Sequence, residues 1–404
     1  MKFLIALLLL VSLFTSCSKS TTSTLANNSH TTILSLVADG ITNNAQTLQQ
    51  AINSCSAAGG GILILPAASG KYMIGPITMK SNVNLHLDSG ATLLASSNMS
   101  DFIVSYKTVD LISGSSLSNV SITGGGTIDG NGAPWWAAYN ANNSISRPRL
   151  IYISTCTNLT LDGITLTNSP SFHFVPYQCT NVTANNVTIT APSNSPNTDG
   201  IDPSQCDNVT ITNCTIDNGD DDIAIKAAGL CQYVTVKDCT FLHGHGLSIG
   251  SETYGGMNHL TVDSCTFNGT TNGIRLKSYI GDGGPMTNLS YSNITMQNVT
   301  NPLVINLAYS APTIPVTYIP IVSGFTINNL TITGSANAGS LVGLSNSILQ
   351  NITLSNINIT ASSPLIITDA NNVTITGSIN GVTLAPGMSS SVIDTTNITK
   401  TSGF

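Results

Sequence analysis

The stretch "CDNVTITNCTI", Cys206–Ile216, is one copy of a pattern that recurs along the chain. Clear copies begin at Cys156 ("CTNLTLDGITL"), Cys179 ("CTNVTANNVTI"), Cys231 ("CQYVTVKDCTF") and Met257 ("MNHLTVDSCTF"), so successive copies start 23, 27, 25 and 26 residues apart. Weaker copies, such as "SNVSITGGGTIDG" upstream and "LQNITLSNINIT" downstream, extend the pattern over most of the 404 residues. A period in this range indicates an architecture of stacked structural repeats.

Each copy consists of two or three short runs of alternating apolar and polar residues, separated by Asn or Gly. Such alternation is typical of β-strands with one buried face. One unit cannot bury its apolar side alone, but stacked units can, so each copy is predicted to form one turn of a parallel β-helix. We therefore predict an all-β protein with a single solenoid domain at residues 33–404.

The open N-terminal end of a solenoid needs a cover. The segment "NNAQTLQQAINSCSAAGGG" has the pattern of an amphipathic helix, with Asn43 or Asn44 as its N-cap, apolar residues such as Leu48 and Ile52 on one face, and Gly59–Gly61 as its stop. We predict that it forms an N-terminal capping helix.

Stacking of the copies would place the cysteines in two ladders, one with Cys156, Cys179, Cys206 and Cys231, the other with Cys214, Cys239 and Cys265. We interpret them as small apolar residues in a stacked core. One or two disulfides remain an open alternative in an oxidising compartment. A cysteine metal site is disfavoured, because no CxxC spacing occurs.

The N-terminus "MKFLIALLLLVSLFTSCSKS" has Lys2 followed by an apolar run, Phe3–Phe14, that is too short to span a bilayer. This is typical of a secretory signal, predicted at residues 1–16. "FTSC" resembles the lipobox of bacterial lipoproteins, which implies lipidation of Cys17; cleavage and simple secretion is the alternative. The polar residues 17–32 would form a tether. We expect an exported protein, held at the outer membrane, the cell surface or the periplasmic side by its lipid.

Charged residues are scarce, at 8% of the chain, and the net charge is −7. With only 12 Lys and Arg, general nucleic-acid binding is excluded. Yet seven of the 19 acidic residues fall between Asp199 and Asp222, and "DNGDDDIAIK" holds three aspartates in a row. Adjacent like charges resist burial, so their concentration here indicates a site that needs negative charge.

A β-helix brings residues that are one repeat apart to about 4.8 Å from each other. Asp199 and Asp220 are 21 residues apart, Asp221 and His245 are 24 apart, and His245 and Arg275 are 30 apart. The motifs "NTDG", "GDDD", "GHG" and "RLK" are therefore predicted to stack in consecutive coils, where carboxylates, a histidine and two cations would line one groove.

Neighbouring carboxylates raise one another's pKa, so one can hold a proton while another is ionised. Glycoside hydrolysis needs this division of labour, with an acid at the leaving oxygen and a base at the attacking water. Aspartates in a turn can also simply accept hydrogen bonds from backbone amides. The alignment of four motifs favours the catalytic interpretation.

These residues resemble family 28 of the glycoside hydrolases, the polygalacturonases and their relatives. The resemblance runs from "GGGILILPAASGKYMIGPITMKSNVNLHLDSGATL" through "GTIDGNGAPWW", "RPRLIYI" and "NSPSFHF" to "SPNTDGIDP", "GDDDIAIK", "GHGLSIGSE" and "GIRLKS". It implies a right-handed parallel β-helix of the pectin-lyase-like type. It also implies inverting hydrolysis of α-1,4-galacturonosyl linkages in pectin or polygalacturonate.

The resemblance further implies roles for individual residues. Asp220 would be the general acid, Asp199 and Asp221 would activate water, and His245 would lie beside them. Substrate-binding residues would be Asn197 of "NTD", Arg275 and Lys277, which match an Arg-x-Lys motif for a uronate carboxylate, and Tyr309. Asp222 stands where relatives often have Cys, so it is not expected to be catalytic.

Two other classes are weighed against this interpretation. A calcium-dependent pectate lyase would share the fold and the substrate, and a non-catalytic β-helix adhesin or carbohydrate-binding protein would share the fold alone. We expect no metal and no cofactor, because alternate strand residues facing a polar groove explain His243 and His245 without an ion. We also expect a monomer. The sequence leaves endo and exo cleavage undecided.

Overall fold

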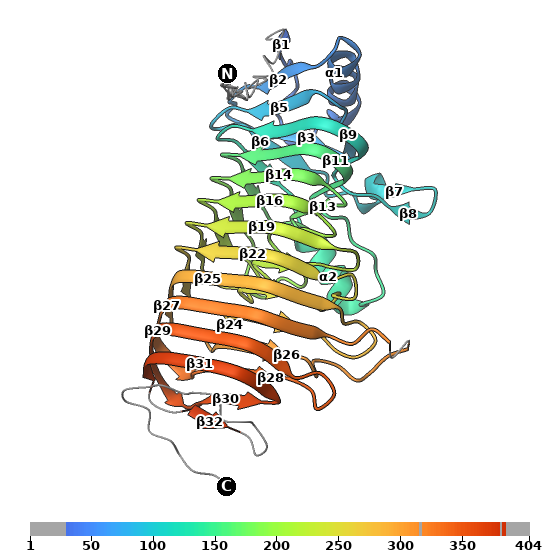
Figure 1. Ribbon diagram of the computed structural model, residues 1–404. Coiled ribbons are helices and arrows are strands. Elements are labelled where there is room, and N and C mark those ends of the chain that lie inside the picture. The colour runs from blue at the N-terminus through green and yellow to red at the C-terminus, as the bar shows by residue number, and fades with distance from the viewer. Residues whose placement is uncertain (1–29, 315–316, 380–381, 385–404) are drawn as a thin grey trace, which may run out of the picture.

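The computed structural model describes residues 30–314, 317–379 and 382–384. The predicted signal peptide, the lipidation site Cys17 and most of the predicted tether lie outside the described residues. Within them, strands of successive coils pair in parallel, so the predicted parallel β-helix is confirmed (Figure 1). The coils stack in chain order from the N-terminal to the C-terminal end.

Three stacks of strands form the solenoid. The first contains β1 (His30–Ile33), β2 (Gly61–Leu65), β5 (Val83–Leu87), β9 (Ile112–Thr123), β11 (Ile151–Asp162), β14 (Thr180–Asn185), β16 (Asp207–Thr212), β19 (Cys231–Lys237), β22 (Met257–Asp263), β25 (Pro285–Gln297), β27 (Ile321–Asn337), β29 (Leu349–Ser363) and β31 (Ala370–Ile379). The second contains β3 (Tyr72–Ile74), β6 (Thr92–Ala95), β10 (Thr127–Asp129), β12 (Thr165–Thr167), β15 (Thr188–Thr190), β17 (Thr215–Asp217), β20 (Thr240–Phe241) and β23 (Thr266–Asn268).

The third stack carries the candidate site. It contains β18 (Ile223–Ile225), β21 (Leu247–Ile249), β24 (Asn272–Lys277), β26 (Asn301–Asn306), β28 (Ser340–Val342), β30 (Leu365–Thr368) and β32 (Val382–Leu384). Two short strands, β4 (Ile77–Thr78) and β13 (Phe174–Tyr177), pair with β9 and β11. Single parallel bridges through Ile201 join β13 to β18, so the third stack continues toward the N-terminus.

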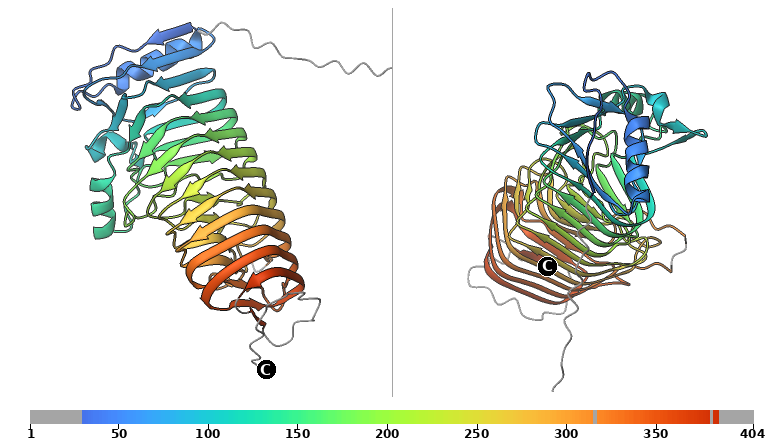
Figure 2. Two further views of the ribbon diagram at one scale, coloured as in Figure 1. Left: turned by 90° about the vertical axis from the view of Figure 1, so that its left-hand side faces the viewer. Right: turned by 90° about the horizontal axis from the view of Figure 1, so that it is seen from above.

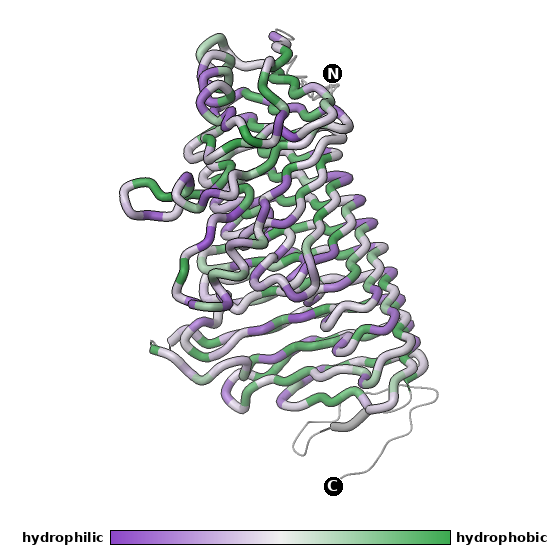
Figure 3. Tube along the Cα trace, turned by 180° about the vertical axis from the view of Figure 1, so that it is seen from behind, coloured by the Kyte–Doolittle hydropathy of each residue, from purple (hydrophilic) through white to green (hydrophobic). Residues whose placement is uncertain are grey.

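The core follows from the alternation in the repeats. Inward residues in register, such as Val182, Val209, Val234 and Leu260, are almost fully buried. Apolar and polar segments alternate along each coil, as the hydropathy colouring shows (Figure 3). The interior is therefore a continuous apolar column.

A ladder of asparagines runs through the strands of the first stack. Asn119, Asn158, Asn181 and Asn208 all have positive φ, a backbone region that asparagine tolerates better than most residues. Each side chain in this asparagine ladder donates to the amide oxygen of the previous coil, at 2.8–2.9 Å. The ladder joins neighbouring coils at the surface.

The cysteines form the two predicted ladders. The backbone N–H of Cys156 donates to Cys179 Sγ, and that of Cys179 donates to Cys206 Sγ, both at 3.4 Å. All eight cysteines in the described part of the chain are free. The disulfide alternative is therefore wrong for these residues.

The predicted N-terminal helix is α1 (Ala45–Ala57), which lies at the N-terminal end of the solenoid (Figure 2). Leu48 and Ile52 are fully buried in the core. Asn44 precedes the first turn but uses its side chain to bind Val37 and Met73 instead of capping the helix. That α1 acts as a cap for the open end stays a prediction.

A second helix, α2 (Ala133–Ala141), and a short 3₁₀ helix, η1 (Met99–Phe102), lie beside the coils. Trp135 of α2 is buried against Phe102, with ring centroids 5.7 Å apart. Beyond η1, a hairpin of β7 (Ile103–Val104) and β8 (Lys107–Thr108) projects from the solenoid. No helix among the described residues is long and apolar enough to cross a membrane.

Candidate active site

The loops that precede the third stack hold the predicted catalytic side chains. Register aligns Ile201, Ile223 and Leu247 across successive coils. Asp199, Asp221 and His245 each lie two residues before one of these aligned positions. The structure thus places "NTDG", "GDDD" and "GHG" on adjacent coils, as their spacing predicted.

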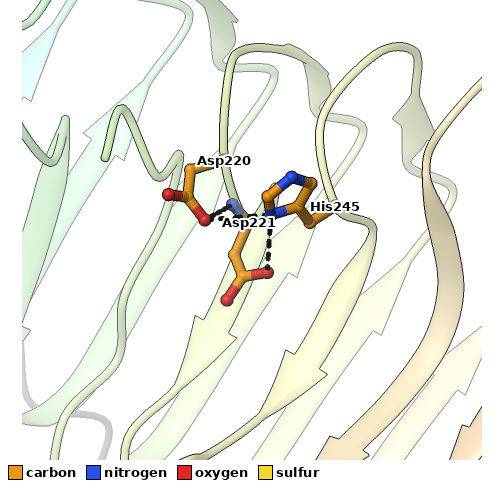
Figure 4. A group of neighbouring side chains, drawn as sticks. All are labelled: Asp220, Asp221 and His245. Carbon is orange, nitrogen blue, oxygen red and sulfur yellow. Dashed lines mark hydrogen bonds and ion pairs between the residues drawn. The ribbon is translucent and has the colours of Figure 1, made fainter. Parts of the chain in front are cut away.

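Asp220, Asp221 and His245 form the centre of the site (Figure 4). His245 Nδ1 is 3.1 Å from Asp220 Oδ1 and 3.9 Å from Asp221 Oδ1. The backbone N–H of Asp221 also donates to Asp220 Oδ1, at 2.9 Å. The side chain of Asp220 is 24% exposed and that of Asp221 only 1%, so Asp220 is the more accessible carboxyl group.

The two glycines of "GHG" allow this approach. Gly244 and Gly246 have φ of +89° and +72°, in the left-handed region that glycine adopts without strain. A Cβ at Gly244 would lie 2.7 Å from Asp222 Oδ1 and from the backbone oxygen of Asp220. A side chain at Gly244 would therefore push the histidine loop away from the aspartates.

Asp221 is bound on both oxygens by cations. Lys277 Nζ donates to Oδ2 at 2.8 Å, and Arg275 Nη2 donates to Oδ1. Ser248 Oγ lies 3.0 Å from Oδ1 and accepts a hydrogen bond from Arg275 Nε at 2.8 Å. The two cations thus form charge-assisted hydrogen bonds with the carboxyl group of Asp221.

Asp199 is buried beside these groups. It is 4% exposed, and its Oδ1 has no hydrogen-bond partner among the described residues. Burial, followed by the negative charges of Asp202, Asp220 and Asp221, raises its pKa well above the usual range. Burial therefore favours the protonated form of Asp199 in the free protein.

The pKa of Asp220 moves the other way. Burial alone would raise it, but the hydrogen bond and charge of His245 and the backbone N–H of Asp221 outweigh burial. The pKa of Asp220 consequently lies below its usual value. The sequence predicts carboxyl groups with different pKa values but cannot show which of them holds the proton.

The remaining predicted substrate-binding residues also lie here. Asn197 Nδ2 is 3.3 Å from Asp220 Oδ2. Tyr309 is 48% exposed, and its ring centroid is 5.8 Å from Lys277 Nζ. A cavity of about 420 Å³, lined by Arg147, Arg149, Phe172 and Asn197 among others, adjoins Asn197 on the N-terminal side.

Three further residues lie in the site without having been assigned a role from the sequence. Ser248 aligns with Arg275 on the outward side of β21 and β24, which the alternation of "LSI" could have indicated. Asp202 is 1% exposed, and burial raises its pKa to about 8, although Lys226 opposes this. Burial disfavours the charge of Lys226, but Asp202, Asp199 and Asp221 outweigh burial and raise its pKa.

Asp222 is fully buried, away from this accessible surface. One of its oxygens accepts the backbone N–H of Gly246 at 2.9 Å. Burial raises its pKa well above the usual range, against the effect of that hydrogen bond. Asp222 holds the loops together, and its exclusion from catalysis stays a prediction.

A metal ion could be considered at Asp220, Asp221 and His245, whose ligand atoms lie within 4.8 Å of one another. However, Asp221 already binds Arg275 and Lys277. A cation added here would face two others, so the donor set does not suit a metal.

Comparison with known proteins agrees with this geometry. The profile described as "Glycosyl hydrolases family 28" matches residues 55–382. The chain belongs to glycosyl hydrolase family 28. This family 28 protein is therefore a glycoside hydrolase with a parallel β-helix fold, as the sequence motifs predicted.

Individual relatives of this family 28 protein can be compared. An endo-polygalacturonase of Pectobacterium carotovorum subsp. carotovorum is 37% identical over 289 residues, covering 65% of this chain and 71% of the relative. A polygalacturonase of Ralstonia solanacearum is 31% identical over 331 residues, covering 66% and 62%. The solved polygalacturonase from Erwinia carotovora ssp. carotovora superposes with a TM-score of 0.77 at 32% identity, covering 85% of this chain and 96% of that one.

Proposed function

We propose that this family 28 protein hydrolyses α-1,4-galacturonosyl linkages in polygalacturonate, the acidic backbone of pectin. The observation that carries the proposal is the cluster of three aspartates, Asp199, Asp220 and Asp221, beside the cations Arg275 and Lys277. Acid, base and carboxylate-binding groups are thereby collected in one groove of a glycoside hydrolase. Relatives named polygalacturonase support the same substrate.

Asp220 is proposed as the general acid. It is the most accessible carboxyl group of the three and lies against His245. In the free protein its pKa is lowered, so it must gain a proton when substrate binds. A polyuronate would cover Asp220 from water and add negative charge, and both effects raise a carboxyl pKa.

Asp199 and Asp221 are proposed to activate the attacking water. The proton on Asp199 in the free protein would pass to Asp220 as substrate binds, which leaves Asp199 ionised beside Asp221. One shared proton would then sit at the leaving oxygen while two carboxylates face the water. An acid and a base separated by a water molecule give inversion at the anomeric carbon.

Substrate recognition is assigned to Arg275, Lys277, Tyr309 and Asn197. A guanidinium has five N–H donors and an ammonium three, so Arg275 and Lys277 can bind Asp221 and still offer donors to a uronate carboxylate. Tyr309 offers an exposed ring next to Lys277, where a sugar face could pack. These cations favour galacturonate over a neutral sugar.

A calcium-dependent lyase and a carbohydrate-binding adhesin are the alternatives. Membership of a glycoside hydrolase family opposes the first, and the paired acid and base groups oppose the second. A lyase would leave an unsaturated product that absorbs in the ultraviolet. A binding protein would leave the polymer intact.

The deciding experiment is digestion of de-esterified polygalacturonate, followed by reducing-end release, ultraviolet absorbance and proton NMR of the first products. We expect new reducing ends without unsaturation and with inverted anomeric configuration. The product sizes would also distinguish endo from exo cleavage. Retained configuration at early times would reject Asp199 and Asp221 as bases, and no cleavage would reject the function.

We further propose that the protein is exported as a monomer, with a signal peptide at residues 1–16, a lipid on Cys17, and a tether at 17–32 before one β-helix domain at 33–404. The sequence motif at residues 14–17 supports this proposal. Labelling of expressing cells with a fatty-acid analogue tests it. Label on the wild-type chain that disappears in Cys17→Ala is the expected result, and an unlabelled wild-type chain would leave simple secretion.

A further inference from the structure

Arg147 contacts the candidate active site from outside the repeat. It lies between α2 and β11, and its guanidinium carbon is 3.7 Å from the ring centroid of Tyr139. Arg147 Nη1 donates to the backbone oxygens of Pro170 and Pro196, at 2.9 and 2.6 Å. These contacts fix the guanidinium plane between two coils, because its donors form a rigid fork.

The same guanidinium reaches the residue next to the general acid. Arg147 Nη2 donates to Asn197 Oδ1 at 2.7 Å. An amide side chain has one accepting and one donating end of similar shape, but a guanidinium can only donate. Arg147 therefore dictates that the amide oxygen of Asn197 faces it and that the amide nitrogen faces the other way.

The amide nitrogen faces the carboxyl group of Asp220. Asn197 Nδ2 lies 3.3 Å from Asp220 Oδ2. The other oxygen of Asp220 is occupied by the backbone N–H of Asp221 and by His245. A carboxylate is stabilised by donors at both oxygens, whereas a proton on Oδ2 finds no acceptor at Asn197.

This arrangement suits an acid that must release its proton. If the Asn197 amide were reversed, its oxygen would accept a hydrogen bond from protonated Asp220 and retain the proton. With the amide held as it is, the proton on Oδ2 can be directed only toward a substrate. We propose that Arg147 is a positioning residue that orients Asn197 and so controls proton release by Asp220.

The proposal rests on the proposed function, in which Asp220 is the general acid. Other charged groups also act on Asp220 and must stay constant in a test. They are Asp199 and Asp202 from the preceding coil, Asp221 and Asp222 from its own loop, His245 from the next coil and Lys277 from β24.

The test compares the Asp220 titration in four proteins: wild type, Arg147→Met, Asn197→Gly and the double variant. Asn197 has a φ of +53°, so glycine removes the amide without adding strain. Carboxyl-¹³C aspartate labelling reports the titration, and the signal that disappears in Asp220→Asn identifies the group. This measurement does not depend on catalysis.

We expect Arg147→Met and Asn197→Gly each to raise the Asp220 midpoint by about 0.5–1 pH unit. Asn197→Gly removes the amide donor of Asp220, and Arg147→Met removes the group that holds this donor toward the carboxylate. The double variant should match Asn197→Gly alone. If Arg147 acted only through its charge, the Arg147→Met shift would persist in the Asn197→Gly background, and the proposal would be overturned. An unchanged midpoint in Asn197→Gly would overturn it even if Arg147→Met folded poorly.

A kinetic readout follows the same logic. The alkaline limb of the kcat profile on polygalacturonate should move to higher pH in Arg147→Met, with KM changed little. Arg149→Met is the matched control, because Arg149 also stacks on a tyrosine, Tyr152, but pairs with Asp110 and not with Asn197. An alkaline limb that moves equally in Arg147→Met and Arg149→Met would contradict the role of Arg147 as the residue that orients Asn197. If wild type cleaves no polygalacturonate, the proposed function fails while the titration still decides the role of Arg147.

Discussion

The asparagine ladder and the groove of the candidate active site are built by the same stacking of coils but differ in how their polar groups are satisfied. In the ladder, Asn158, Asn181 and Asn208 each donate to an identical residue of the previous coil, so donors and acceptors match. In the groove, stacked positions carry Asp199, Asp221 and His245. Equal spacing thus yields matched hydrogen bonds where residues repeat and a cluster of titratable groups where they differ.

The largest effect should come from the groove. Asp220→Asn preserves shape but cannot donate a proton to the leaving oxygen, so turnover should fall on the order of 10²-fold to 10⁴-fold. The melting temperature should change little. Asp222→Asn is the matched control and should keep much of the activity, because an amide oxygen can still accept the backbone N–H of Gly246. Initial rates on polygalacturonate check both variants, and equal losses would show that the catalytic pair is misassigned.

Lys277→Ala should have the next largest effect. It removes a cation from Asp221 and, under the proposal, from the substrate carboxylate, so kcat/KM on polygalacturonate should fall about tenfold to a hundredfold. The loss of the Asp221 contact would affect every substrate alike. A smaller loss on fully methyl-esterified polymer therefore isolates carboxylate binding.

The exposed Lys237, on the first stack, provides the control for Lys277. Lys237→Ala removes the same charge far from the described site contacts and should leave both polymers unaffected. An identical proportional loss on charged and esterified polymers in Lys277→Ala would refute recognition of a uronate carboxylate.

Substitutions in the asparagine ladder should lower the free energy of unfolding and leave the turnover of the folded protein unchanged. Asn181→Ala breaks hydrogen bonds to Asn158 and Asn208 and places alanine, which tolerates positive φ less well than asparagine, at a φ of +57°. The expected cost is about 1–3 kcal/mol of unfolding free energy. Asn181→Gly also lacks the side-chain hydrogen bonds, but glycine adopts positive φ without strain. Denaturant titration of both variants therefore separates the cost of the lost hydrogen bonds from the cost of the backbone strain. A loss of turnover in either folded variant would contradict the division between ladder and groove.

The last prediction concerns the pH dependence of stability at Asp202. Its pKa is raised by burial to about 8, above the usual 3.8, so its stabilising contribution is present below about pH 4 and is lost as pH rises through 8. Asp202→Asn removes this loss, and its unfolding free energy relative to wild type should increase between pH 4 and 8. Chemical unfolding at several pH values measures this.

Asp39 gives a comparison of opposite sign. It is exposed, and hydrogen bonds from Thr42 and Ile41 lower its pKa. Its stabilising contribution is present above the unfolded pKa and is lost as pH falls. Asp39→Asn should therefore lose stability relative to wild type as pH rises through the acid range. The same trend in both variants would show that Asp202 is not held in its neutral form.

The grouping of the candidate site residues was predictable because their motifs lie about one repeat apart, and stacking of the coils turns that spacing into contact. The repeat positions of Cys179 and Cys206 predicted how successive coils align. The structure shows the same alignment for the loops before β18 and β21. Contacts from outside the repeat were not predictable in this way. Arg147 reaches Asn197 through a loop of irregular length, and no period relates the two positions.

The charge arrangement was predicted only in part. The scarcity of Lys and Arg indicated that Arg275 and Lys277 serve the site, but not that both bind Asp221. The difference between Asp199 and Asp220 depends on burial and on His245, which spacing does not reveal. The types and the order of the residues therefore predict which side chains belong to the site. The pKa values of these side chains depend on how they pack in the folded protein.

The stacked coils also limit how the length of such a protein can change in evolution. A coil touches chiefly its two neighbours, so duplication or deletion of a whole coil toward the C-terminal end would leave the remaining interfaces in register. The segment from Asn197 to Lys277 has no such freedom, because Lys277 binds Asp221 across an intervening coil. Within that segment, evolution can exchange side chains but must conserve the number of turns.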